Sequence, residues 1–343
     1  MKHYYIGADV HCNNTELAIE HKKKIISRYS VPTNIEAISE VLTTIDGRKF
    51  LALEEGPMAG WLYRNLKDKV HKVIVCDPRR NKLIASDGDK NDKIDAAKLA
   101  ALLRGKFLRS VYHTDNEQRL ELKRWVGIYD DRIKEATRYI NRIRAQGRMY
   151  GIKIPTEIIR KAQTRLNWLE TLNNRHLAKR IEILLIGYDA AKVQAKQAKE
   201  QMLQIAKDYR VIRLWQDLPG IGPIRAITLF AYLDTPYRFK KKSALWKYCG
   251  LGLSRQTSGK DKHGNNNKTK LKLEYRCNRK LKNVIVGAVR SAIGYGDNDF
   301  KKYYEELIFN GKKASNVRHS VGRKMLTIMW GMWKADSLYA VGD

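Results

Sequence analysis

Residues 117–209 contain almost no glycine or proline, and this feature constrains the fold more than any other. Two series of apolar residues recur there with alternating spacings of four and three, the pattern of a coiled-coil seam. The first series is Leu122, Val126, Tyr129, Ile133, Ala136, Ile140 and Ile143, and the second is Leu177, Ile181, Leu184, Tyr188, Ala191, Ala195, Ala198, Met202, Ile205 and Tyr209. A turn over residues 147–155 and a shorter helix over residues 157–172 separate them. We therefore predict an antiparallel helical arm that dimerises.

The predicted arm carries a series of arginines, which fit either a surface that binds nucleic acid or a solvated face. They are Arg132, Arg138, Arg142, Arg144 and Arg148. The whole chain has 67 Lys and Arg residues against 36 Asp and Glu residues, so its formal net charge is +31. Such an excess predicts a polyanionic partner, with nucleic acid the first candidate and an anionic membrane surface the second.

The sequence predicts neither export nor a membrane span. No apolar run is long enough to cross a bilayer, and the first residues lead into a predicted strand without a signal-peptide pattern. The cysteines are scattered and form no Cys-x-x-Cys pair, which argues against a zinc site or a disulfide framework. They are Cys12, Cys76, Cys249 and Cys277. We therefore expect a cytoplasmic protein.

The first third of the chain is typical of an α/β domain with a mixed sheet, in the order βββαβαβα. Predicted strands cover residues 4–11, 16–20, 24–29, 49–53 and 72–77. Predicted helices cover residues 34–43 and 59–66, and a last one begins near residue 91. The ranges follow from alternating apolar residues in the strands and from helical spacing in the helices.

Acidic side chains stand where this predicted sheet would place a site. Asp9 ends the first strand, Glu54 and Glu55 follow the fourth, and Asp92 and Asp95 open the last helix on one face. A ribonuclease-H-like nuclease domain needs this arrangement, in which four acids hold two metal ions for phosphoryl transfer. Taken singly, each acid could instead be a helix cap or a strand end.

The last third is predicted to be mostly helical, with several cationic segments. Gly220 and Gly222 lie in a Pro-Gly-Ile-Gly turn typical of a helix-hairpin-helix motif, in which glycines let a phosphate approach the backbone. An ordinary helix–helix turn is the alternative. Further on, Lys240 and Lys241 stand among aromatic residues, which suits a nucleic-acid interface.

A polar loop around Ser258 contains a further candidate for chemistry. A serine among cations such as Lys260 and Lys262 could attack a phosphodiester, because the cations would stabilise the charged transition state. Ser-Gly is also common turn chemistry, and Ser254 and Thr257 are neighbouring hydroxyls. A basic amphipathic helix, which carries Arg318 and Arg323, closes the chain.

Taken together, the motifs resemble a known family over nearly the full length. The chain resembles the DEDD-type transposases of the insertion sequence 110 group, which are bridge-RNA-guided recombinases. The motifs that carry the resemblance are Gly-Ala-Asp-Val-His at 7–11, Leu-Glu-Glu-Gly at 53–56, Asn-Asp-Lys-Ile-Asp-Ala at 91–96, Leu-Pro-Gly-Ile-Gly at 218–222, Arg-Phe at 238–239, Gly-Leu at 250–251, Ser-Gly at 258–259 and Asn-Val-Arg-His-Ser-Val-Gly-Arg at 316–323.

The resemblance implies a RuvC-like domain over residues 1–113, a coiled-coil segment over 114–212 and a C-terminal transposase domain over 213–343. It implies that Asp9, Glu54, Asp92 and Asp95 bind Mg²⁺, or Mn²⁺ in its place. Ser258 would be the nucleophile that forms a phosphoserine link to DNA. The family often has Glu-Ala-Thr-Gly where this chain has Glu-Glu-Gly, so Glu55 is the alternative to Glu54.

The implied partners are DNA, as element ends and target, and a noncoding guide RNA. The resemblance also implies a homo-oligomer, a dimer or a tetramer in the synaptic complex, with an active site shared between subunits. Such a bacterial recombinase would associate with the nucleoid when it binds DNA. Two other functions fit the residues: an endonuclease that resolves DNA junctions by hydrolysis, and a non-catalytic RNA-binding protein whose acids are structural.

Overall fold

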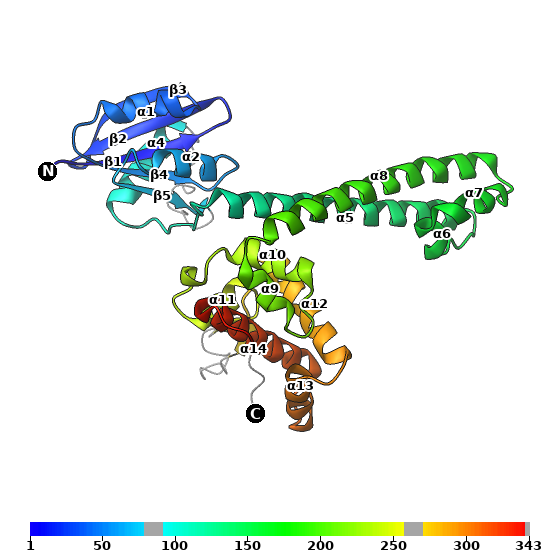
Figure 1. Ribbon diagram of the computed structural model, residues 1–343. Helices are drawn as coiled ribbons and strands as arrows, with labels where there is room; N and C mark the ends of the chain where they lie inside the picture. The colour runs from blue at the N-terminus through cyan, green and yellow to red at the C-terminus, as the bar shows by residue number, and fades with distance from the viewer. Residues whose placement is uncertain (79–91, 257–269, 340–343) are drawn as a thin grey trace, which may run out of the picture. The chain divides into compact units, whose positions relative to one another are not determined.

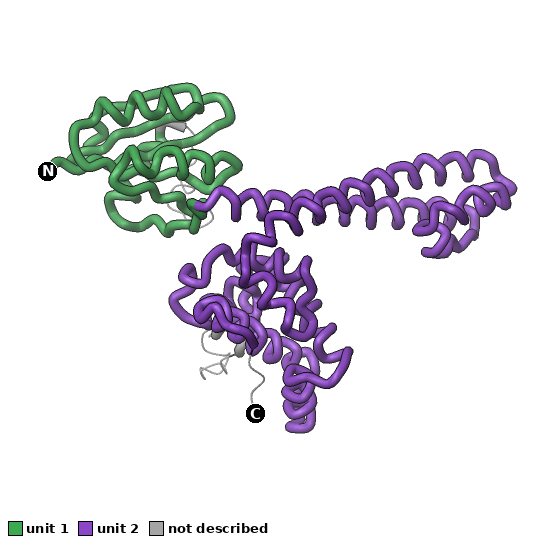
Figure 2. The backbone as a smooth tube through the Cα atoms, in the orientation of Figure 1, with its two compact units in different colours: residues 1–115 green, residues 116–343 purple. Residues whose placement is uncertain are grey.

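The computed structural model describes residues 1–78, 92–256 and 270–339. By their internal contacts the residues divide into two units, Met1–Asp115 and Asn116–Asp343 (Figure 2). The long helical segment and the C-terminal helices belong to the same unit. No helix in the described ranges is both long enough and apolar enough to cross a membrane.

Unit 1 is an α/β domain built on a five-stranded mixed sheet (Figure 1). Its elements are β1 (His3–Val10), β2 (Asn14–His21), β3 (Lys24–Pro32), α1 (Ile35–Thr43), β4 (Arg48–Glu54), α2 (Ala59–Leu66), β5 (Lys72–Cys76) and α4 (Asp92–Arg104). The strand order is β3-β2-β1-β4-β5, with β1 parallel to β4, β4 parallel to β5, and the other pairs antiparallel. The predicted element order and mixed sheet are confirmed.

The two faces of the sheet pack against different helices, because successive side chains of a strand point to opposite sides. Ile6 and Ala8 of β1 lie in a buried cluster with Leu51 of β4 and with residues of α1 and α2. Helix α4 packs on the opposite face, against β1, β2 and β4. There Arg104, in the last turn of α4, forms an ion pair with the buried Glu20 of β2.

Unit 2 begins with an antiparallel pair of long helices (Figure 1). The arm consists of α5 (Glu117–Arg148), α6 (Thr156–Arg160), α7 (Ala162–Glu170) and α8 (Arg175–Ala206). Hydrogen bonds between the long helices run in antiparallel order, from Arg132 to Gln194 (3.1 Å) and from Arg180 to Gln146 (2.9 Å). The predicted single helix over 157–172 is in fact two, α6 and α7, because the backbone between them is extended at residue 161.

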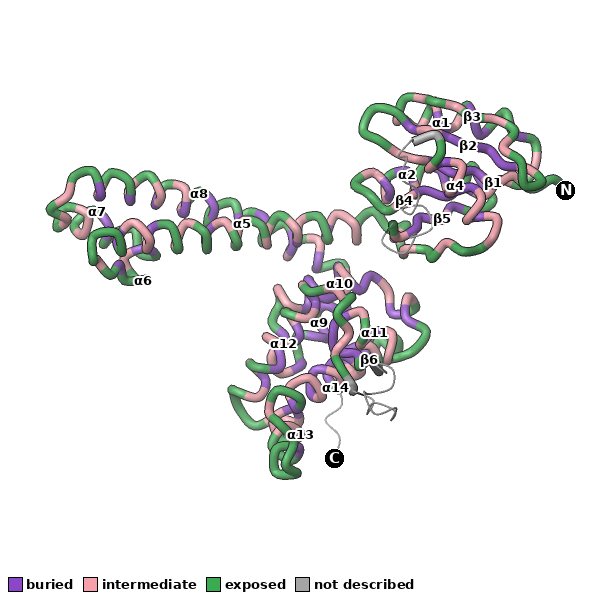
Figure 3. The backbone as a smooth tube through the Cα atoms, turned by 180° about the vertical axis from the view of Figure 1, so that it is seen from behind, coloured by how far each residue is buried: buried purple, intermediate pink, exposed green. Residues whose placement is uncertain are grey.

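The buried residues of α8 follow the predicted seam closely but not everywhere. They are Leu177, Ile181, Leu185, Tyr188, Ala191, Ala195, Ala198, Met202 and Ala206, and they form the buried stripe seen along the arm in Figure 3. Leu185 is buried where the spacing predicted Leu184, and Ala206 where it predicted Ile205. At each of these two points the buried residue lies one position after the predicted one.

The rest of unit 2 is mostly helical, as predicted. It contains α9 (Arg210–Gln216), α10 (Pro223–Leu233), the short 3-10 helix η2 (Pro236–Arg238), α11 (Lys242–Tyr248), the hairpin of β6 (Leu253–Gln256) and β7 (Lys270–Leu273), α12 (Arg279–Gly294), α13 (Asp299–Phe309) and α14 (Ala314–Ala335). Trp215 lies at the centre of the core and donates a hydrogen bond to the carbonyl of Met329 (2.9 Å). Leu122 and Val126 of α5 are part of this core.

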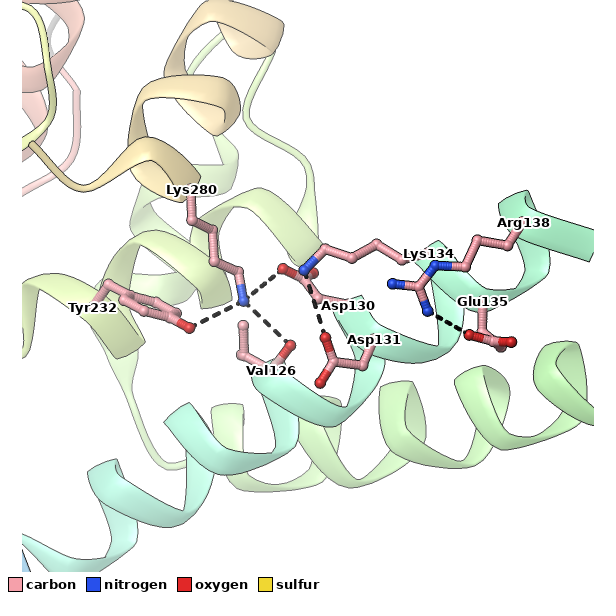
Figure 4. Close-up of polar contacts among 8 residues, drawn as sticks. All are labelled: Val126, Asp130, Asp131, Lys134, Glu135, Arg138, Tyr232 and Lys280. Atoms are coloured by element: carbon pink, nitrogen blue, oxygen red, sulfur yellow. Dashed lines mark hydrogen bonds and ion pairs between the residues drawn. The ribbon is translucent and has the colours of Figure 1, made fainter. Parts of the chain in front are cut away.

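Lys280 fastens α12 to α5 and α10 (Figure 4). Its Nζ lies 2.6 Å from Oδ2 of Asp130, 3.3 Å from the carbonyl oxygen of Val126 and 3.1 Å from the hydroxyl of Tyr232. The Lys280 and Asp130 side chains are only 20% and 29% exposed, so water screens this ion pair less than a surface pair.

Asparagine side chains fix where several helices begin. An asparagine precedes α1, α5, α8, α12 and α13, and in each case its side chain accepts a hydrogen bond from a backbone N–H of the first turn. This N-cap satisfies a backbone donor that has no partner within the helix.

Candidate active site

Asp9 and Glu54 lie side by side at the carboxyl ends of two neighbouring parallel strands. They directly follow the paired residues Ala8 of β1 and Leu53 of β4. Ala8 and Leu53 point into the cluster beneath α1 and α2, so Asp9 and Glu54 point to the face that α4 covers. Neighbouring strands are separated by about 4.8 Å, so the backbones at Asp9 and Glu54 lie side by side.

Gly7 brings α4 close to the same strand. A Cβ at Gly7 would overlap the carbonyl oxygen of Ala96 and lie 2.7 Å from the backbone nitrogen of Ala100. The absence of a side chain on β1 therefore allows the helix backbone to contact the strand. Asp95 precedes Ala96 in the first turn of α4, which places it near the carboxyl end of β1, and it is half-buried.

The fourth predicted acid, Asp92, is the first residue of α4, so the helix begins where the sequence predicted. Its side chain lies outside the described residues. Among the side chains that the structure describes, no three acids, histidines or cysteines form a group that could hold a metal ion. The four predicted metal ligands thus remain a prediction that the described residues do not test.

The sequence pattern did not predict a third carboxylate that lies on this face of the sheet. Glu16 of β2 is the direct antiparallel partner of Asp9, so its side chain lies on the same face and is half-buried. Glu16, Asp9 and Glu54 thus form a row across three adjacent strands, which we call the carboxylate row. His11 lies at its edge, with Nε2 3.3 Å from Oδ2 of Asp9.

Glu55 occupies a different environment from Glu54. It follows the end of β4, and its Oε2 lies 2.7 Å from Nε2 of His113. The His113 side chain is largely buried, while that of Glu55 is 41% exposed. The alternation of the strand therefore assigns Glu54 to the carboxylate row and leaves Glu55 bound to His113.

In the sequence, the predicted serine falls between β6 and β7, which pair as a hairpin. Ser258, Thr257, Lys260 and Lys262 all lie outside the described residues. The strands that flank them are paired in register from Leu253 with Leu273 to Gln256 with Lys270. Ser254 donates a hydrogen bond to the carbonyl of Lys272 (3.3 Å), so this alternative nucleophile is part of the hairpin ladder.

Arg323 supports the base of this hairpin. Its guanidinium donates to the carbonyl of Leu251 (3.0 Å) and to the hydroxyl of Ser320 (2.9 Å). Burial lowers the pKa of Arg323, and burial together with Lys282, Arg323 and Arg318 lowers the pKa of His319. The predicted nucleic-acid residues Arg318 and Arg323 thus lie in a cationic cluster beside the hairpin.

The predicted arginines of the arm have different surroundings. Arg132 bonds to Gln194 of α8, and Arg138 forms an exposed ion pair with Glu135 (2.6 Å). Arg142 lies over the ring of Tyr139, 5.7 Å from its centroid. At the tip, Arg144 and Arg148 line a cavity of about 430 Å³. These contacts leave the proposed role in nucleic-acid binding a prediction.

The two glycines of the predicted hairpin turn have different roles. Gly220 has a φ of +83°, and a Cβ there would overlap the carbonyl oxygen of Ala288 in α12. Packing against α12 therefore explains this glycine. Gly222 is exposed at the start of α10, with nothing within 4 Å of a Cβ there. Lys240 and Lys241 are exposed just before α11.

Two family models match the chain, and they cover the two regions just described. A model of DEDD transposases of the IS110 type, described as a transposase, matches residues 6–148. A model of transposases of the IS116/IS110/IS902 family matches residues 212–305. The first match spans the carboxylate row and α4, and the second spans the β6–β7 hairpin.

A curated relative agrees with these matches. The chain is similar to the transposase for insertion sequence element IS1111A of Coxiella burnetii (strain RSA 493 / Nine Mile phase I). The two are 21% identical over 260 residues, which is 74% of this chain and 69% of that protein. The chain therefore belongs to the IS110 family of transposases, and it is an enzyme of DNA transposition.

Proposed function

We propose that this transposase joins DNA strands through a metal-dependent RuvC-like domain and a serine nucleophile, at sites chosen by a noncoding guide RNA. The observation that carries the proposal is that Asp9 and Glu54 occupy neighbouring positions on the α4 face of the sheet, near the first turn of α4. Hydrolytic and strand-transfer enzymes of the ribonuclease-H-like type use carboxylates placed in this way.

The donor set of the site suits a hard divalent cation. Mg²⁺ prefers carboxylate oxygens, and Asp9, Glu54, Asp92 and Asp95 would hold it, or Mn²⁺ in its place. Glu16 lies directly opposite Asp9, and like charges in that position repel, so a cation held by the four acids would also reduce this repulsion. When bound, the ion would polarise a phosphoryl oxygen as a Lewis acid.

Ser258 would supply the nucleophile. Its hydroxyl would lose its proton, its oxygen would bond to the phosphorus of the scissile phosphodiester, the bond to the 3′-oxygen would break, and that oxygen would take up one proton. A new 3′-hydroxyl would later attack the phosphoserine, restoring the serine and joining the new strands. The cationic cluster of Arg318 and Arg323 supports this role, because cations beside the hairpin would attract the phosphate.

The excess of positive charge supports nucleic acid as the partner. A formal net charge of +31 suits a protein that binds a guide RNA together with the element ends and target DNA. A dimer or tetramer, with the carboxylate row of one subunit serving the serine hairpin of another, would complete the site.

The decisive experiment is strand exchange with purified protein, guide RNA, DNA substrates and Mg²⁺. Asp9→Asn and Glu54→Gln should abolish exchange without loss of folding or RNA binding, whereas Glu55→Gln should retain it. Loss of activity in Glu55→Gln with full activity in Glu54→Gln would transfer the metal-binding role to Glu55.

A second experiment separates the serine mechanism from hydrolysis. Suicide DNA substrates should trap a covalent protein–DNA adduct with the natural chain and none with Ser258→Ala. Cleavage without any adduct, and unaffected by Ser258→Ala, would instead support the junction-resolving endonuclease. Membership of a transposase family argues against the non-catalytic RNA-binding alternative.

A further inference from the structure

A second cationic cavity lies in unit 1, among residues that the proposed chemistry does not use. Its volume is about 550 Å³, and it is lined by the N-terminal part of β1, the turn between β2 and β3, and the end of α4. The lining residues are Met1, Lys2, His3, Tyr5, His21, Lys22, Lys23 and Arg104. Asp9 lies toward the other end of β1, so this cavity is distinct from the carboxylate row.

The cavity is strongly positive. Lys2, Lys22 and Lys23 are exposed, and no carboxylate of the described ranges forms an ion pair with them. Arg104 is the exception, because it is paired with the buried Glu20. Three exposed lysines around one cavity are suited to binding an anion with several negative groups.

Aromatic rings accompany these cations. The Tyr5 ring stacks on Phe50 of β4 with centroids 5.4 Å apart, and His3 meets Phe50 edge-on at 5.7 Å. His21 stacks on Tyr4 at 4.8 Å and bonds to the carbonyl of His3 (3.0 Å), which fixes one wall of the cavity. Proteins that bind single-stranded nucleic acid commonly stack aromatic rings on the bases and place cationic side chains against the phosphates.

The two lysines of the turn between β2 and β3 are not residues that the conformation of this turn favours. His21 pairs with Lys24, so Lys22 and Lys23 are the two central residues of a tight hairpin. Both have positive φ, +47° and +67°. Such turns strongly prefer Asn-Gly, because at positive φ the Cβ of most residues lies too close to the backbone carbonyl oxygen. The chain nevertheless has two lysines there, both lining the cavity.

From this combination we propose that the cavity binds single-stranded nucleic acid, with Lys2, Lys22 and Lys23 on the phosphates and the rings of Tyr5 and His3 against an unpaired base. The proposal rests on the proposed function for the presence of a nucleic-acid partner. It adds a binding site on unit 1 that is separate from the proposed chemistry.

The turn offers a variant that separates binding from folding. Lys22→Asn combined with Lys23→Gly removes two charges and installs the residues that the turn prefers, so the thermal midpoint should not fall. Each phosphate contact to a single strand contributes a salt exponent of about 0.7, so two contacts are worth about 25-fold in affinity at about 0.1 M salt. The slope of log affinity against log salt should decrease by about 1.4.

The control removes the same charge elsewhere in unit 1. Lys69→Asn combined with Lys106→Gly also loses two lysines, one of them at positive φ (+58°), and neither lines the cavity. Affinities of the full-length variants would be measured in EDTA with a uridine-rich RNA, a thymidine-rich DNA strand and a DNA duplex. Because no cleavage occurs in EDTA, the result does not depend on the proposed chemistry.

The proposal expects the turn variant to lose single-strand affinity about 25-fold relative to this control, with little effect on the duplex. Lys2→Ala, which leaves the turn intact, should lose about fivefold. A stronger loss with RNA than with DNA would identify the guide as the ligand, and the reverse would identify displaced DNA. If the turn variant matches its control, the site does not exist. An equal loss on the duplex would overturn the stacking of an unpaired base.

Discussion

Gly7→Ala tests how the site is assembled, because it adds one methyl group where α4 contacts β1. The added Cβ would overlap the carbonyl oxygen of Ala96 and lie 2.7 Å from the backbone nitrogen of Ala100 and 2.9 Å from the Cβ of Leu99. Two of these three atoms belong to the helix backbone, so a change of side-chain rotamer cannot relieve the overlap. The helix itself has to move.

The distances set the size of the effect. Ordinary contact begins at 3.4 Å, so the 2.7 Å approach alone requires α4 to retreat by about 0.7 Å. Overpacking of this kind costs about 1–3 kcal/mol of unfolding free energy. The same movement carries Asp95 away from the carboxylate row. Since a displacement of about 1 Å can cost about 100-fold in rate, we expect strand exchange to fall at least about tenfold.

Two measurements on one variant make the prediction testable. Chemical denaturation gives the unfolding free energy, and strand exchange in Mg²⁺ gives the activity. Gly56→Ala is the matched control, because a Cβ there meets nothing within 4 Å, and its stability should change by less than about 0.5 kcal/mol. If Gly7→Ala were as stable and as active as Gly56→Ala, the close contact between α4 and β1 would be refuted.

Three further predictions concern stability and reactivity. Asp130→Ala leaves the half-buried Lys280 without its carboxylate partner (Figure 4) and should cost about 1–3 kcal/mol, whereas Asp131→Ala, which removes an exposed pair, should cost less than about 0.5 kcal/mol in the same urea titration. At pH 8 a thiol reagent should modify the exposed Cys12 in the folded chain but not Cys249, because burial raises the pKa of Cys249; rapid modification of Cys249 would contradict its burial. Burial and a hydrogen bond to a carboxylate raise the pKa of Tyr339 from 10.0 to about 12, so its stabilising effect is complete below pH 10 and is lost as the pH rises to 12. Unfolding free energy should therefore fall over that interval, and less so in Tyr339→Phe.

The sequence predicted the parts of the site that depend on local pattern. Asp9 and Glu54 follow short apolar strands, and the carboxyl ends of such strands meet at one edge of a parallel sheet. Glu16 was missed because its position depends on the register of a hairpin. The structure pairs Val10 with Thr15, which sets Glu16 opposite Asp9. The register is centred between Cys12 and Asn13, so counting outward from the Asn-Asn sequence at residues 13–14 would have set Ala18, not Glu16, opposite Asp9.

Other differences have long-range causes. A seam predicted by strict alternation of four and three drifts on a straight helix, which has 3.6 residues per turn. Two of the predicted spacings of three are accordingly four in the structure, from Ile181 to Leu185 and from Met202 to Ala206, while the buried residues from Tyr188 to Met202 are the predicted ones. The packing of Gly220 against Ala288 joins segments far apart in the chain, so no local pattern could distinguish it from a phosphate-binding glycine.

Helix α5 belongs to two hydrophobic cores at once. Leu122 and Val126 lie in the core of the C-terminal helices, while Ala136 and Ile143 lie in the separate core of the arm. The helix is continuous over its 32 residues, a length of about 48 Å. A force applied at the tip of the arm would therefore act through a stiff lever, anchored by Lys280, on the core that carries the β6–β7 hairpin. Ligand bound at one end could in this way bias the packing at the other without any loop in between.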